Sequence, residues 1–114
     1  YAAMGIMFSV DDANVEVTDE EQKILDDFFN SLDWDTVDSD PKVAEVPYGN
    51  LMMLVNMKDR WVYKVSVTTP PCAQYVYWNV LRTIYPLRQS VLDKFKNQLK
   101  RTPGLDQTGN WREI

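Results

Sequence analysis

The chain has no histidine and only one cysteine among its 114 residues. Without imidazole it cannot build a three-histidine zinc site or a nucleophile activated by a neighbouring histidine, and a single cysteine cannot form a disulfide within the chain. It also has no apolar run of about 18 residues and no basic segment ahead of an apolar one, which are the patterns of a membrane-spanning helix and of a secretory signal peptide. If Tyr1 is an internal position of a longer precursor, the second absence says nothing about secretion.

Charge is distributed unevenly along the chain, whose net charge is −5. Residues 11–40 hold twelve acidic residues against Lys23, whereas residues 82–101 hold six basic residues against Asp93. Such segments are most often the solvated faces of a small domain, and the acidic balance disfavours nucleic acid as a partner. The aspartate pair Asp11-Asp12 and the aspartates at positions 33 and 35, with Asp38 and Asp40, lack the glycine and terminal glutamate of an EF-hand loop, so we expect a solvated acidic loop there and no calcium site.

The hydrophobic pattern predicts a sheet with two peripheral helices. Three segments have the β-branched, aromatic or apolar composition of strands: residues 4–10, 61–67 and 73–81. Thr18 and Glu21 form a capping box ahead of a helix over residues 19–31, and a second apolar stripe predicts a helix over residues 88–100. Residues 33–46 have the composition of a loop.

One apolar segment is ambiguous. Residues 48–57 are rich in leucine and methionine, but the run is too short and irregular to be assigned to a strand or to a helical turn. Its methionines fit core filling better than a contact surface.

The most informative stretch is residues 66–72 (Ser-Val-Thr-Thr-Pro-Pro-Cys), followed by residues 76–81 (Val-Tyr-Trp-Asn-Val-Leu). Proline locks its own φ and drives the preceding residue into an extended conformation, so such a turn can hold the threonine hydroxyls in fixed directions. The stretch resembles the active-site loop and strand of the α-class carbonic anhydrases, which read close to Gly-Ser-Leu-Thr-Thr-Pro-Pro-Cys and then Val-x-Trp-x-Val-Leu.

The resemblance extends to both ends of the chain. Residues 1–8 look like a family strand that follows all three metal ligands, and residues 109–114 look like a segment near the family's C-terminus. It implies that residues 1–114 are the C-terminal half of a single α-carbonic anhydrase-like domain. The expected fold class is mainly β (α+β): part of a large twisted mixed sheet with peripheral helices, with an edge left open or filled by another polypeptide, and with a cis bond between Pro70 and Pro71.

The resemblance implies reversible, zinc-dependent hydration of carbon dioxide to bicarbonate, with the three histidine ligands outside this chain. Thr68 matches the gatekeeper threonine, the expected catalytic residue, whose hydroxyl orients the reacting hydroxide. Thr69 matches a second threonine, which contacts the substrate. The apolar wall of the substrate pocket carries over to four positions: Ala3, Val67, Val76 and Trp78.

Four positions depart from the family pattern. Ala3 stands in place of valine and should widen the pocket, while Val67 in place of leucine removes one methylene. Val65 replaces a glycine, and a β-branched residue adopts positive φ only at a cost, so the geometry of the threonine loop would change if that glycine uses such a conformation. Glu113 replaces the proline usual after Arg112, a change that concerns packing more than chemistry.

Cys72 matches a cysteine that, in secreted and membrane-bound members of the family, pairs with one near the start of the domain. The resemblance therefore implies a half-cystine and an extracellular, cell-surface or luminal protein, with a buried free thiol as the alternative.

Three functions remain open from the sequence. The leading interpretation is a carbonic anhydrase acting on carbon dioxide and bicarbonate, in which this chain is completed by the N-terminal half of the domain or by a second chain. The alternative is a catalytically silent module of the same fold within a larger assembly. An unrelated acidic interaction domain would leave the motif unexplained. Whichever holds, we expect no enzymatic activity from the isolated 114 residues, because they lack the imidazole ligands.

Overall fold

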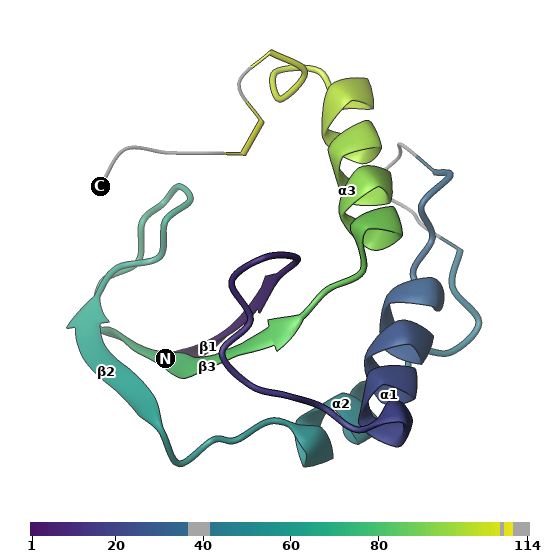
Figure 1. Ribbon diagram of the computed structural model, residues 1–114. Coiled ribbons are helices and arrows are strands. Elements are labelled where there is room, and N and C mark those ends of the chain that lie inside the picture. The colour runs from purple at the N-terminus through teal and green to yellow at the C-terminus, as the bar shows by residue number, and fades with distance from the viewer. Residues whose placement is uncertain (37–41, 108, 111–114) are drawn as a thin grey trace.

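In the computed structural model, which describes residues 1–36, 42–107, 109 and 110, three strands form one mixed sheet in the order β1-β3-β2. The central strand β3 (Val76–Pro86) pairs in parallel with β1 (Ala2–Ser9) and antiparallel with β2 (Arg60–Val65). Figure 1 shows this sheet on one side of the molecule and the helices on the other. Helices and a mixed sheet together confirm the α+β class, and the helices hold more residues than the strands.

The strands follow the predicted apolar segments, but β3 is displaced toward the C-terminus. It was expected over residues 73–81, whereas it begins at Val76 and continues to Pro86. Strand β3 continues to Pro86 because it goes on pairing with β1. Gly5 pairs with Val80 and Met7 pairs with Ile84, so β3 has two more residues than β1 between these pairs, and the regular pairing resumes after this irregularity. A sequence pattern cannot reveal this partner.

Both predicted helices are present. Helix α1 (Asp19–Asn30) begins with the predicted capping box, in which the Thr18 hydroxyl accepts the Glu21 N–H at 3.2 Å and the Glu21 carboxylate accepts the Thr18 N–H at 2.8 Å. The ambiguous segment forms a short helix, α2 (Tyr48–Leu54), and the last helix is α3 (Gln89–Arg101).

The hydrophobic core lies where α1 and α2 meet the C-terminal part of β3. Five buried residues form it: Leu25, Leu51, Val55, Leu81 and Tyr85. The Tyr85 hydroxyl accepts the backbone N–H of Asn56 at 2.7 Å, so its polar end is satisfied inside the core. Of the methionines predicted to fill the core, Met52 packs against it, whereas Met53 is 88% exposed and Met57 is also exposed, so the prediction holds for Met52 alone.

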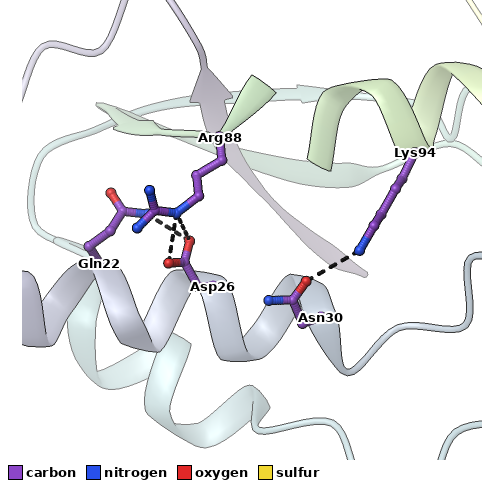
Figure 2. A network of polar contacts seen from close by, with 5 residues as sticks. All are labelled: Gln22, Asp26, Asn30, Arg88 and Lys94. Atoms are coloured by element: carbon purple, nitrogen blue, oxygen red, sulfur yellow. Dashed lines mark hydrogen bonds and ion pairs between the residues drawn. The ribbon is translucent and has the colours of Figure 1, made fainter. Parts of the chain in front are cut away.

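Two side-chain contacts connect α1 to α3 (Figure 2). The guanidinium of Arg88, the N-cap of α3, donates from Nε to both carboxylate oxygens of Asp26, at 2.9 and 2.8 Å. Gln22 donates to the same carboxylate at 3.0 Å, and one turn further along α1 Asn30 accepts from Lys94 at 3.4 Å. These contacts hold α3 against α1 beside the sheet.

The edge of the sheet that β2 forms is little covered by the rest of the described chain. All six residues of β2 are exposed, including Trp61 at 61%, Tyr63 at 47% and Val65 at 49%. In the part of the chain that the structure describes, β1 and β2 each pair with β3 alone. The predicted open edge is therefore present, and an open edge with apolar side chains is a surface on which further polypeptide can add.

Candidate active site

The threonine loop connects β2 to β3 and extends beyond the sheet, away from α1 and α2 (Figure 1). Two backbone hydrogen bonds close it: Val67 N–H to the Ala73 carbonyl at 2.9 Å, and Cys72 N–H to the Thr69 carbonyl at 2.8 Å. The Pro70–Pro71 bond is cis, as the resemblance implied. Thr68 and Thr69 come just before the two prolines of this turn, and both are exposed.

Val65 does not distort the loop. It lies within regular strand β2, opposite Val76 of β3, and positive φ occurs instead at Cys72 (54°) and Tyr75 (66°). Val65 therefore does not need a left-handed backbone conformation, and the expected change in loop geometry at this position does not occur. The left-handed conformations of the connection are at two later residues.

Three of the four predicted wall positions, Ala3, Val76 and Trp78, lie on one face of the sheet. Ala3 of β1 and Tyr63 of β2 are both in register with Trp78 of β3, so the three residues form a row across the sheet. Val76 precedes Trp78 by two residues and therefore faces the same side. Val76 is 3% exposed, whereas Trp78, Ala3 and the loop residue Val67 are half-buried.

The wall and the threonine loop are linked directly. The indole Nε1 of Trp78 donates a hydrogen bond of 3.0 Å to the carbonyl oxygen of Ser66, two residues before Thr68. Trp78 therefore contributes both apolar surface to the wall and a fixed attachment for the loop.

Sequence reasoning missed the part played by Asn79. Its side-chain amide donates to the Ala3 carbonyl at 3.3 Å and accepts from Arg60 Nε at 3.0 Å, so one side chain of β3 reaches both neighbouring strands. An asparagine within an apolar strand was the available signal, since such a residue usually has a specific hydrogen-bonding partner. Its effect here is to hold Ala3 in position beside Trp78.

Cys72 is a free, exposed cysteine. The alternative of a buried thiol is therefore wrong, and the side chain is accessible to a partner. The Lys64 ammonium of β2 lies 4.9 Å from the centre of the Tyr75 ring and 5.4 Å from that of Tyr77, within the range of cation–π attraction. These contacts are on the sheet face opposite Trp78.

The residues present do not fit a zinc centre. The chain has no imidazole, and among the residues that the structure describes no three His, Cys, Asp or Glu side chains are grouped so that they could hold a metal ion.

No described helix is long and apolar enough to cross a membrane. The acidic positions Asp38 and Asp40 and the motif positions Arg112 and Glu113 lie outside the described residues.

Comparison with known protein families gives a match over the whole chain. The family model described as eukaryotic-type carbonic anhydrase matches residues 1–114.

Proposed function

Because this chain belongs to the eukaryotic-type carbonic anhydrase family, whose members are generally zinc-dependent, we propose that it is the C-terminal half of a domain that interconverts carbon dioxide and bicarbonate. In this proposal the chain supplies Thr68, Thr69 and the apolar wall, while the zinc ligands lie outside it. The N-terminal half of the domain or a second chain provides them.

The hydrogen bond between Trp78 and Ser66 carries the proposal. Carbon dioxide is linear and apolar, so a site for it needs a dry apolar surface, and its hydration needs a polar group that orients the attacking oxygen. The wall residues supply the surface, and the Thr68 hydroxyl is the polar group. Since Trp78 belongs to the wall and fixes the loop, the two requirements are met by one connected unit.

The exposure of the sheet supports the need for a second polypeptide segment. A wall containing Trp78 binds an apolar substrate only when water is excluded from its face, yet Tyr63 in the same row is 47% exposed. Further polypeptide packed on this face would exclude water and bring the metal ligands. The small side chain of Ala3 leaves room beside the indole, and we infer a wider substrate pocket at this point than valine would give.

Cys72 supports a second part of the proposal, that it forms a disulfide with a cysteine outside these residues in an extracellular, cell-surface or luminal protein. Its exposure makes the thiol accessible to such a partner. Non-reducing mass spectrometry of the secreted full-length protein should find Cys72 in a cross-linked peptide. Labelling of Cys72 by a thiol reagent without prior reduction would count against this part alone.

The exposed apolar side chains of β2, above all Trp61 and Tyr63, also favour the alternative of a catalytically silent module that binds a larger assembly. Stopped-flow hydration of carbon dioxide separates the two functions. The complete domain that contains residues 1–114 should be active with zinc, and the 114-residue chain alone should be inactive at any zinc concentration. An inactive, metal-free complete domain would support the silent module, and zinc-dependent activity of the isolated chain would contradict our assignment of the ligands.

A further inference from the structure

Strand β2 ends the sheet with an edge that is open within the described part of the chain, and it lies at the margin of the ribbon in Figure 1. The Asp59 carbonyl, just before β2, accepts the Arg82 N–H at 3.0 Å, and the direction of the backbone groups alternates along an antiparallel strand. The residues of β2 with odd numbers therefore direct their N–H and C=O groups at β3. Arg60, Val62 and Lys64 direct theirs outward, where another strand can bond to them.

The side chains of β2 also suit another strand at this edge. Trp61, Tyr63 and Val65 alternate along β2 and point to the face that carries the proposed substrate wall, where they are 61%, 47% and 49% exposed. They form an apolar row beside outward backbone groups, a combination that favours strand addition. The charged residues of β2 are Arg60 and Lys64, both cationic, so a strand of the same sequence has to avoid placing them opposite one another.

We propose that two copies of this chain pair antiparallel through β2, with Tyr63 of one copy opposite Tyr63 of the other. In this register the apolar rows of both copies lie on one face, the outward backbone groups meet, and no like charges are opposed. A shift by two residues in one direction would place Arg60 opposite Lys64 of the second copy. The same shift in the other direction would place the two Lys64 side chains opposite each other, and larger shifts pair at most half of the strand.

The proposed register determines which residues meet across the new contact. Val62 of each copy lies opposite Lys64 of the other, and these pairs exchange backbone hydrogen bonds. Trp61 lies opposite Val65 of the second copy, and the two Tyr63 rings meet at the two-fold axis, where the side chains of a non-hydrogen-bonded pair are closest. The two sheets become one, and the two-fold axis closes the assembly at a dimer. The contact uses an edge, so it does not depend on the proposed enzymatic function.

Two substitutions at Val62 test the register, because this 55% exposed side chain is predicted to lie opposite Lys64 of the second copy. Val62→Glu would create two opposite-charge pairs, whereas Val62→Lys would create two like-charge pairs. Sedimentation equilibrium of the 114-residue chain should show a dimer, with a dissociation constant roughly tenfold lower for Val62→Glu than for Val62→Lys. High salt should reduce this difference.

General repulsion between copies cannot produce that order, because the chain has a net charge of −5 and added glutamate would weaken a contact of unspecified geometry. A monomeric wild-type chain, equal dissociation constants of the two variants, or tighter association of Val62→Lys would overturn the proposal.

Amide hydrogen exchange of the wild-type chain tests the contact without a substitution. The N–H groups of Val62 and Lys64 should exchange slowly in the dimer and rapidly after dilution to the monomer. Those of Trp61 and Tyr63, which point to β3, should stay protected under both conditions and serve as the control. Rapid exchange at Val62 and Lys64 in the dimer would contradict the proposal. Slow exchange of the same two amides in a monomeric complete domain would assign the edge to another segment of the longer chain and would contradict it as well.

Discussion

Trp78 and Ser66 are joined by a 3.0 Å hydrogen bond from the indole Nε1 to the backbone carbonyl oxygen. The bond spans the connection between β2 and β3, so the backbone just before Thr68 is fixed by a residue of the proposed substrate wall. Loop geometry and wall packing are consequently coupled, and a change in Trp78 affects both.

Trp78→Phe keeps an aromatic ring in the wall and removes the donor to Ser66. We expect a loss of about 1 kcal/mol in the free energy of unfolding, because the half-buried carbonyl loses its partner. Urea denaturation measures the change. Trp61→Phe is the matched control: this side chain is 61% exposed, so the loss should stay within about 0.5 kcal/mol. Equal effects of the two substitutions would show that the indole hydrogen bond contributes nothing.

Asp33 gives a prediction about pH. Hydrogen bonds from the Thr36 side chain, the largest cause, and from the backbone N–H groups of Thr36, Asp35 and Lys42 lower the pKa of its carboxyl from 3.8 to about 2. A depressed folded-state pKa contributes stability above the unfolded value and loses it as the pH falls. The contribution of Asp33 should therefore be complete above about pH 4 to 5 and be lost between that pH and about 2.

NMR titration of the Asp33 carboxyl carbon tests this shift directly. Thr36→Val, which removes the strongest of the hydrogen bonds, should raise the pKa of Asp33 toward 3.8, and Asp33→Asn should flatten the pH dependence of unfolding in the same window. A wild-type carboxyl that titrates near 3.8 would contradict the hydrogen-bonding arrangement at this turn.

The contact between Arg88 and Asp26 should couple α3 to α1 (Figure 2). The Asp26 side chain is 23% exposed, against 57% for Arg88, so solvent screens the pair in part and we expect a coupling energy of about 0.5 to 1 kcal/mol. A double-mutant cycle with Asp26→Asn and Arg88→Gln measures it, and 1 M salt should reduce it.

The exposed pair of Lys23 and Asp27 within α1 serves as the comparison for this cycle. Its side chains are 73% and 54% exposed, and its coupling should not exceed about 0.5 kcal/mol. If the Arg88 pair couples no more strongly than this one, the contact does not hold the two helices together.

Local signals predicted local structure well. The capping box at Thr18 and Glu21 needs only residues three apart, and the structure has it as predicted. The extent of β3 to Pro86 was not predictable in this way, because it depends on pairing with β1 some eighty positions earlier in the chain. Helix α2 could not be assigned because seven residues span too few turns to show a period.

For the candidate site, too, the sequence predicted which residues belong to it but not the contacts between distant residues. The resemblance pointed to Thr68 and to the wall positions, and register brings Ala3 and Trp78 side by side. The roles of Trp78 as the donor to Ser66 and of Asn79 as a link between strands depend on contacts across the sheet, which a single sequence does not reveal. The placement of positive φ at Cys72 and Tyr75 likewise depends on how the closed loop returns to β3.

The central claim is that the chain supplies the catalytic threonine of a carbonic anhydrase, and turnover of Thr68→Val in the complete zinc-loaded domain tests it most directly. Loss of one preorganised hydroxyl beside the reacting oxygen should lower stopped-flow carbon dioxide hydration roughly 10²-fold. Thr83→Val makes the same change in β3 outside the loop and should keep wild-type turnover. A Thr68→Val domain as active as the wild type, with its zinc and fold intact, would contradict the account.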